Sequence, residues 1–423
     1  MTRPFRDLAA SKRSLRCNNE LFSLVHMLNE GSASAPAGKS LISLAIGDPA
    51  VDGNFLPPDE LIKSVVEGAK STLCNNYPSC AGETPAREAV AKYLIDHFAP
   101  NMKGIKIPCD NVFICSGSSD ALSISIGVLC NPGDNILLPA PYFAHYGTLC
   151  RYYDVTPKFY RCDPAKEWEI DLDHLRSLVD DRTRAVLMNN PSNPCGSNFS
   201  RKHLEDFLRV CECHHLPVIA DEIYAGMVFK GQDPNAVFTS VADIDTSVPR
   251  LVVGGISKRF SVPGYRLGWV VLLDREGYAA RLPDAMECLL TRCLLPHSVL
   301  MHALPNILAN TPKSYFEESN TRLEKGAIAL YEALRKCPGL RPTRPCGGMF
   351  IAVQLVPEEL EESVRNDVAF ARRLAEEENV QVFPGVAFKM ESALRITVSR
   401  PLPLLMEAAS RIEAFCQRHS LRK

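Results

Sequence analysis

The stretch that decides the fold is residues 255–269, which read GISKRFSVPGYRLGW. An apolar run, 251–253 (LVV), precedes it and another, 270–273 (VVLL), follows it, so we expect two buried strands joined by a loop with glycines and a proline. That loop carries Lys258, Arg259 and Arg266. A cation at the end of a buried strand is costly unless it has a partner or a reaction to perform. The loop is therefore the first candidate for chemistry.

Upstream of this stretch, apolar runs alternate with helix-like segments. The runs predict strands at 112–115, 135–138, 185–188 and 217–220, and the segments predict helices at 121–129 and 201–214. This alternation is typical of right-handed crossover units in a mostly parallel sheet. Functional residues in such a sheet lie just past the carboxyl ends of the strands.

The two ends of the chain together predict a smaller unit. A strand at 41–46 follows a linker of small residues at 31–38, and after residue 269 the pattern becomes helical, with short strands at 346–353, 380–383 and 394–398. We expect an N-terminal arm and part of a small domain at 1–60, a large domain at 61–310 and a C-terminal small domain at 311–423.

Composition excludes several classes of function. The net charge of −2 over 423 residues provides no electrostatic basis for binding nucleic acid or a membrane surface, and no run reaches the ~20 apolar residues of a membrane span. The 16 cysteines are scattered, which fits free thiols in a reducing compartment. We expect a cytoplasmic protein, with mitochondria as the alternative because the first residues are faintly basic.

Four polar groups follow predicted strands, and each has two interpretations. The segment 116–119 (SGSS) is a helix cap or a phosphate cradle, and 189–196 (NNPSNPCG) is a turn or presents an amide to a ring hydroxyl. Asp221 is a helix cap or a buried carboxylate that needs a cationic partner, such as a protonated pyridine nitrogen. Lys258 is a surface lysine or a nucleophile whose pKa burial and nearby positive charge would lower.

Taken in order, three motifs resemble the class I pyridoxal-phosphate aminotransferases. They are NPSNPCG (190–196), ADEIY (220–224), and SKR (257–259) continued by PGYRLGW (263–269). The resemblance runs from about residue 40 to the C-terminus and is greatest to the tyrosine aminotransferases. It implies the α/β fold of the fold type I pyridoxal-phosphate transferases: a large domain with a mostly parallel seven-stranded sheet between helices, plus a smaller α+β domain from both chain ends. It also implies a homodimer and pyridoxal 5'-phosphate as the cofactor.

The resemblance assigns roles by position. Lys258 matches the lysine that holds the cofactor and moves the proton, and Asp221 matches the partner of the pyridine nitrogen. Asn193 and Tyr224 match the donors to the ring oxygen, and Tyr224 is counted with the catalytic residues. The remaining matches are the phosphate cup (Gly117, Ser118, Ser119, Ser257 and Arg266), the aromatic stacked on the ring (Phe143), a tyrosine that reaches a neighbouring subunit's phosphate (Tyr77), and the substrate-carboxylate site (Arg395, with the Gly47 backbone).

The implied reaction moves an amino group between an aromatic L-amino acid and a 2-oxoacid, as in the first step of tyrosine catabolism. Arg292 matches in position an arginine that binds dicarboxylates in some relatives; the alternative is a solvated helix arginine. A family segment of the substrate pocket is not evident before residue 40, and 18–21 (NNEL) is the candidate replacement.

Two competing functions stay open. A carbon–sulfur β-lyase or another fold type I enzyme would keep the same cofactor residues. A non-catalytic ligand-sensing domain would need an added DNA-binding segment, and residues 1–40 are too short and too neutral for one. The cluster 211–215 (CECHH) lacks a second ligand pair, so we predict no metal site.

Overall fold

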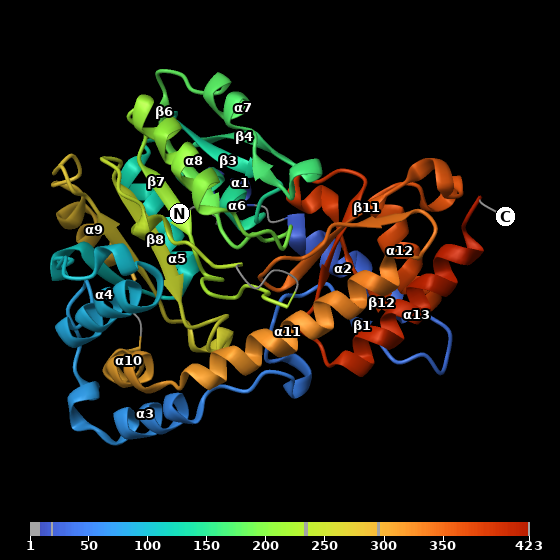
Figure 1. The fold of residues 1–423 in the computed structure, drawn as a ribbon, viewed down its shortest axis with the longest axis horizontal. Helices are drawn as coiled ribbons and strands as arrows, with labels where there is room; N and C mark the ends of the chain where they lie inside the picture. Colours follow the sequence, from blue (N-terminus) through green and yellow to red (C-terminus); the bar gives the residue numbers. More distant parts are fainter. Residues whose placement is uncertain (1–8, 18–19, 232–235, 294–296, 422–423) are drawn as a thin grey trace, which may run out of the picture.

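The computed structural model describes residues 9–17, 20–231, 236–293 and 297–421. Its larger unit is built on a sheet with the strand order β2-β9-β8-β7-β6-β3-β4-β5 (Figure 1). The pairs among β8, β7, β6, β3 and β4 are parallel, while β9 pairs antiparallel with both β2 and β8. The strands span Val112–Cys115 (β2), Asn135–Ala140 (β3), Thr156–Asp163 (β4), Glu169–Ile170 (β5), Thr183–Asn189 (β6), Val218–Asp221 (β7), Arg250–Gly255 (β8) and Gly268–Leu273 (β9).

Successive side chains along each strand of this sheet point to opposite faces and pack into two separate hydrophobic cores. Ile219 and Leu251 belong to one core, together with residues of α5, α6 and α9. Val218 and Val252 belong to the other, with residues of α4, α8 and α10. The helices that cover the sheet span Thr84–Phe98 (α4), Ser118–Leu129 (α5), His145–Tyr153 (α6), Arg201–Cys213 (α8), Leu282–Leu290 (α9) and Ser298–Asn310 (α10), with Asp59–Lys70 (α3) packed on α10 and Leu172–Ser177 (α7) beside β4.

A smaller unit combines the two ends of the chain. Its antiparallel sheet has the order β10-β11-β14-β13, and β1 near the N-terminus pairs in parallel with β12. The long helix α11 runs from the larger unit into the smaller one (Figure 1). The elements span Ile42–Ser43 (β1), Lys313–Leu334 (α11), Leu340–Pro342 (β10), Phe350–Leu355 (β11), Asp367–Glu378 (α12), Val380–Gln381 (β12), Phe383–Pro384 (β13), Ala393–Thr397 (β14) and Leu402–Arg418 (α13).

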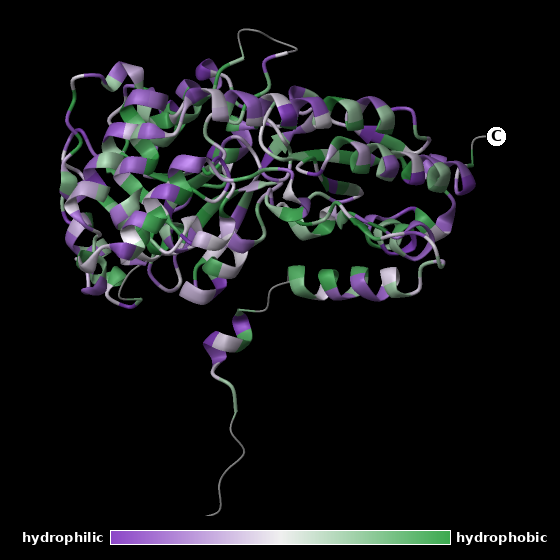
Figure 2. Ribbon diagram, turned by 90° about the horizontal axis from the view of Figure 1, so that it is seen from below, coloured by the Kyte–Doolittle hydropathy of each residue, from purple (hydrophilic) through white to green (hydrophobic). Residues whose placement is uncertain are grey.

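Two helices at the N-terminus run along the outside of the molecule (Figure 2). Helix α1 (Lys12–Arg16) packs on α6, where Arg16 forms an ion pair with Asp154. Helix α2 (Glu20–Ala33) packs on α12 of the smaller unit. Leu21 packs against a core of each unit, so this arm connects the two.

The structure confirms the predicted fold class and corrects details within it. The sheet of the larger unit has eight strands rather than seven, because the two-residue β5 extends one edge. The predicted linker at 31–38 is wrong in part, since α2 continues to Ala33, and the predicted strand at 41–46 is reduced to β1. None of the described helices combines the length and apolar character that crossing a bilayer requires. The three-part division of the chain stays a prediction.

Arg400 ties the N-terminal segment to the smaller unit. Its guanidinium is 3% exposed and donates to the carbonyl oxygens of Ser43, Asp48 and Ile46 at 3.0, 2.8 and 3.0 Å. We expect Arg400→Met to lower the free energy of unfolding by about 3 kcal/mol, because three carbonyl groups lose a charged donor. Urea unfolding followed by circular dichroism measures this. Arg335→Met, which removes an exposed arginine paired with Glu332 on α11, should change it by less than about 0.5 kcal/mol; equal effects would contradict the assignment.

Candidate active site

The predicted site residues gather around one cavity of about 350 Å³ between the larger and the smaller unit. The sheet contributes the residues that follow β6, β7 and β8, α5 contributes its first turn, and β14 contributes an arginine. The lining includes these predicted residues: Gly47, Ser118, Ser119, Phe143, Asn193, Asp221, Tyr224, Ser257, Lys258, Arg266 and Arg395.

Asp221 is the last residue of β7 and is 3% exposed. One carboxylate oxygen accepts a hydrogen bond from the Tyr146 hydroxyl at 2.6 Å, and the other accepts from the Ile223 N–H at 3.2 Å. Burial raises the pKa of Asp221 to about 6, while the bonds from Tyr146 and Ile223 act in the opposite direction. None of the described cationic side chains is within ion-pair distance of it. A buried carboxylate in this state favours a ligand that brings a proton or a positive charge.

Lys258 lies three residues after β8, and its Nζ donates to the Gly47 carbonyl oxygen at 2.7 Å. Burial lowers the pKa of Lys258 to about 8; Asp48 opposes this shift, and the positive charges of Arg395 and Arg266 add to it. A lysine with this pKa has an appreciable neutral fraction at neutral pH, which a nucleophile or a base requires.

Gly47 lets the chain come close to the lysine. A side chain there would collide with the ring of Phe350. The carbonyl that receives the Lys258 ammonium group therefore depends on a residue without a Cβ.

The start of α5 is suited to an anion. The first N–H groups of a helix have no partner inside it and attract anions. Gly117 precedes the helix with φ +78°, and a Cβ there would overlap the guanidinium of Arg266. Arg266 forms no ion pair with a described residue, and Ser257 holds a buried hydroxyl without a hydrogen-bond partner. Together these groups fit a phosphate.

Arg395 on β14 is 5% exposed and makes two hydrogen bonds with described residues. It donates to the side-chain oxygen of Asn193 at 3.1 Å and to the Ala45 carbonyl oxygen at 2.5 Å, and its Nε has no partner. The rings of Phe350 and Phe388 lie 4.3 and 4.4 Å from its guanidinium carbon. Burial lowers the pKa of Arg395, yet the group keeps its charge at neutral pH. A planar cation with a free donor edge is suited to a carboxylate.

Asn193 and Tyr224 complete the polar lining. The backbone N–H of Asn193 donates to the Asn189 side chain at 2.7 Å, and the Asn189 amide donates to the Asp221 carbonyl oxygen at 2.9 Å. This network holds the turn after β6 against the end of β7. Tyr224 is 3% exposed, and burial raises the pKa of its hydroxyl, which therefore stays protonated at neutral pH.

Three predicted residues do not line the cavity. Gly117 lies behind it, against Arg266. Tyr77 is 92% exposed. Arg292 pairs with Asp120 at 3.3 Å and donates to the Tyr153 hydroxyl at 2.9 Å. The roles assigned to Tyr77 and Arg292 therefore stay predictions.

Sequence reasoning missed several residues of the cavity. Tyr146 belongs to α6, which was not predicted, and only its position three residues after the aromatic pair 142–143 gave any signal. Leu21, Phe22 and Val25 line the cavity from α2. Of the candidate replacement segment 18–21, positions 18 and 19 lie outside the described residues. The described residues contain no cluster of His, Cys, Asp or Glu that could hold a metal ion.

Comparisons with known proteins agree on one family. The family model described as "Aminotransferase class I and II" matches residues 39–412. Tyrosine aminotransferase of Mus musculus is 37% identical over 404 residues, covering 95% of this chain and 87% of that protein. An S-alkyl-thiohydroximate lyase of Arabidopsis thaliana is 31% identical, covering 94% of this chain and 84% of that protein. The crystal structure of tyrosine aminotransferase from Leishmania infantum has a TM-score of 0.91 at 38% identity, over 99% and 100% of the two chains.

The residues of the cavity fit pyridoxal 5'-phosphate. The phosphate has the start of α5 with Arg266 and the unpartnered Ser257 hydroxyl, and the pyridine nitrogen has the unpaired carboxylate of Asp221. Lys258 is the primary amine of the cavity, as the cofactor's aldehyde requires. The volume of about 350 Å³ lies within the range of small-molecule sites.

In the cofactor-free protein, the buried Asp221 carboxylate should lower the free energy of unfolding when it is ionised. Its pKa of about 6 lies above the ordinary value near ~3.9, so the folded protein binds the extra proton and is stabilised by it at low pH, and this contribution is lost as the pH rises through about 6. We expect cofactor-free Asp221→Asn to be more stable than the parent at pH 8, with an advantage that grows by about 1 kcal/mol from pH 5 to pH 8. Urea unfolding at both pH values measures it; an advantage independent of pH would contradict the burial argument.

Proposed function

Because the chain belongs to the class I and II aminotransferases and is an aminotransferase that uses pyridoxal 5'-phosphate, we propose that its amino donor is an aromatic L-amino acid. Tyrosine is the first candidate, with phenylalanine, tryptophan and some others accepted, and a 2-oxoacid (pyruvate, 2-oxoglutarate or oxaloacetate) takes the amino group. The observation that carries this proposal is a buried arginine, Arg395, which could anchor a substrate carboxylate in a cavity whose other walls are largely apolar.

The apolar walls come from both units. Leu21, Phe22 and Val25 of α2, Ile46, and Phe143 all line the cavity with Arg395. An aromatic side chain gains free energy by leaving water for such a surface, roughly 25 cal/mol per Å² of apolar area. A positively charged substrate side chain finds no described carboxylate there except Asp221, which the cofactor would use. The likeness to tyrosine aminotransferases also supports this donor.

Cofactor binding divides among four groups of side chains. Ser118, Ser119, Ser257 and Arg266 would hold the phosphate, with Gly117 leaving room for the arginine. Asp221 would hold a proton on the ring nitrogen, and Tyr146 keeps the carboxylate oriented. Asn193 and Tyr224 would donate to the ring oxygen, and Phe143 would supply an aromatic surface for the ring. When bound, pyridoxal phosphate supplies an aldehyde for the amino group and an electron-withdrawing ring.

Lys258 carries the proton transfer. Its pKa of about 8 leaves part of the amine neutral at neutral pH, so Nζ can take the proton from the substrate Cα and deliver it again. Arg395 binds the α-carboxylate through two parallel N–H bonds and thereby orients Cα toward Nζ. The Asn193 side chain, which contacts Arg395, links substrate orientation to the cofactor ring.

A homodimer is part of this proposal. Tyr77 is exposed and Arg292 does not line the cavity of its own chain, so each could act on a site only across a subunit interface. There Tyr77 would contact the cofactor phosphate and Arg292 would bind a dicarboxylate acceptor. The place in tyrosine catabolism and the cytoplasmic location, with mitochondria as the alternative, stay predictions.

A carbon–sulfur lyase is the second candidate, and one observation favours it. The lyase relative from Arabidopsis thaliana is 31% identical over nearly the whole chain, so the same scaffold is compatible with that activity. Release of ammonia and a 2-oxoacid from a cysteine S-conjugate, without any acceptor oxoacid, would support the lyase. A requirement for the acceptor supports transamination.

Lys258→Ala should abolish transamination together with the visible absorbance of the lysine-bound cofactor. Asp221→Asn should keep bound cofactor but lose at least about a hundredfold in kcat, because the ring nitrogen loses its proton. The neighbouring Glu222→Gln is the matched control. Glu222 is equally buried, burial raises its pKa to about 7, and it bonds Ser240 and Val241 away from the cavity. Cofactor absorbance and assays of the transamination rate measure all three variants. Equal losses of kcat in Asp221→Asn and Glu222→Gln would contradict the role of Asp221.

Phe22 tests the donor preference. Its side chain is 74% exposed, so Phe22→Ala should fold, and loss of its apolar surface should lower kcat/KM for tyrosine about three- to tenfold while leaving that for alanine nearly unchanged. Leu73→Ala, at 73% exposure outside the cavity, should alter neither value. Steady-state rates with both donors measure this. A proportional fall for tyrosine and alanine would show that Phe22 does not contact the donor side chain.

A further inference from the structure

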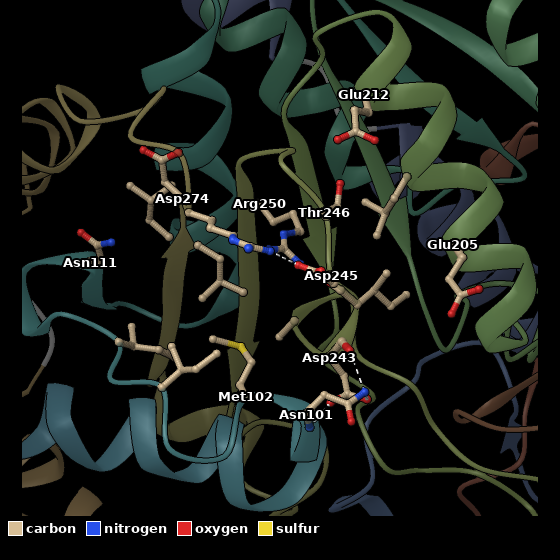
Figure 3. Close-up of a pocket in the computed structure, with 18 of the residues that line it drawn as sticks. Asn101, Met102, Asn111, Glu205, Glu212, Asp243, Asp245, Thr246, Arg250 and Asp274 are labelled. Carbon is tan, nitrogen blue, oxygen red and sulfur yellow. Dashed lines mark hydrogen bonds and ion pairs between the residues drawn. The ribbon is translucent and has the colours of Figure 1, made fainter.

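A second, larger cavity of about 1030 Å³ lies at the amino-terminal end of the parallel strands, away from the active site (Figure 3). It lies where β8 begins, at Arg250, and where its antiparallel neighbour β9 ends, at Leu273. Helix α8 and the segment 101–111 form its sides. The active site lies at the other end of β8, so nothing in the transamination proposal uses this cavity.

Arg250 is a buried cation of this cavity: it is 6% exposed and forms no ion pair with a described carboxylate. Its Nε donates to the Val248 carbonyl oxygen at 3.2 Å, and Nη1 donates to those of Val241 and Ile244 at 2.7 Å each. A guanidinium has five N–H donors, so the two on Nη2 are left without a described partner. Burial lowers the pKa of Arg250 to about 10, so the side chain stays charged.

The carboxylates around the cavity are already engaged. Asp243 pairs with Arg201, and Asp245 pairs with Arg275. Asp274 accepts from the backbone N–H groups of Tyr278 and Ala279 at 3.0 and 2.7 Å, and Glu212 accepts from Ser247. Arg250 therefore has no ion-pair partner among the described residues, although the charges of Asp245 and Glu222 act on it and oppose the effect of burial on its pKa. A buried cation without an ion-pair partner favours an anion that can reach its free N–H groups.

The rest of the lining is apolar on one side. Met102, Ile105, Ile107, Leu208 and Leu272 belong to it. Ile105 is 56% exposed, which leaves apolar surface open at the mouth, and Lys106 beside it forms no ion pair with a described residue. The cavity thus combines one buried cation with an apolar wall, which is the pattern of a site for an amphipathic ligand.

We propose that this cavity binds a small organic anion, with its carboxylate or phosphate group on Arg250 Nη2 and its apolar part against Met102 and Ile105. Oxygen atoms of the charged group would accept from the two N–H groups of Nη2, because Nε and Nη1 already donate to carbonyl oxygens. The site is separate from the substrate site, since the two cavities lie at opposite ends of β8 and share no lining residue.

Calorimetric titration of the cofactor-loaded enzyme tests the proposal with four probes of equal length: hexanoate, hexyl phosphate, hexan-1-ol and hexylamine. We expect saturable binding of one anion per chain, with the alcohol and the amine at least tenfold weaker. Hexanoate and hexyl phosphate distinguish the two sources of negative charge, and tighter binding of either supports the site. The visible absorbance of the cofactor should not change, because a shift would mark binding in the active site.

Variants locate the binding. Arg250→Gln should weaken the anions at least tenfold, and Asp245→Asn should strengthen them because it removes a negative charge that acts on Arg250. Arg209→Gln is the matched control, an arginine of the same cavity that is exposed and already paired with Asp206 at 2.9 Å; it should change binding less than twofold. If Arg250→Gln does not fold, Ile105→Glu at the exposed mouth should weaken the anions at least fivefold. Absence of saturable binding, or binding unaffected by these changes, would overturn the proposal.

Discussion

The site depends on one constraint: ionisable groups are buried close together without being paired to one another. Asp221 is held by a tyrosine hydroxyl and a backbone N–H, Lys258 by a carbonyl oxygen, and Arg395 by a carbonyl oxygen and an amide. If the lysine and the carboxylate formed a salt bridge, both would be neutralised and neither would be available to a ligand. Because each is satisfied by neutral partners, burial shifts the pKa values of Lys258 and Asp221 toward neutrality, where proton transfer is efficient.

The fold supplies these neutral partners from distant parts of the chain. The carboxyl ends of β6, β7 and β8 bring Asn193, Asp221 and Lys258 to one edge of the sheet. The N-terminal segment contributes the Gly47 carbonyl, and the C-terminal β14 contributes Arg395. The smaller unit therefore contributes residues to the site. Arg400 holds the N-terminal segment against the C-terminal part of this unit, and the α1–α2 arm packs on both units. Unpaired buried charges cost stability, and the extensive cores on both sheet faces offset that cost.

Sequence reasoning recovered the strand ends well because buried strands and their polar termini leave a local signature. The predicted strand 112–115 matches β2 residue for residue. The predicted helix 121–129 ends where α5 ends, and the predicted helix 201–214 begins where α8 begins. Tyr146 could not be found this way, since its function is a hydrogen bond to a residue 75 positions away. Helix α2 was not predicted either: its last residues, 31–33, fell within the predicted linker, and the helix packs on α12, which is far from it in the sequence. Roles that cross a subunit boundary, as proposed for Tyr77, leave no mark within a single chain.

The central claim is that the Asp221 carboxylate keeps a proton on the pyridine nitrogen of the cofactor. The most direct measurement is the 15N chemical shift of that nitrogen in enzyme reconstituted with ring-labelled pyridoxal phosphate at pH 7.5. The account predicts the shift of a protonated pyridine in the parent enzyme and in Glu222→Gln, and that of an unprotonated pyridine in Asp221→Asn. A protonated nitrogen in Asp221→Asn, or an unprotonated one in the parent, would contradict it.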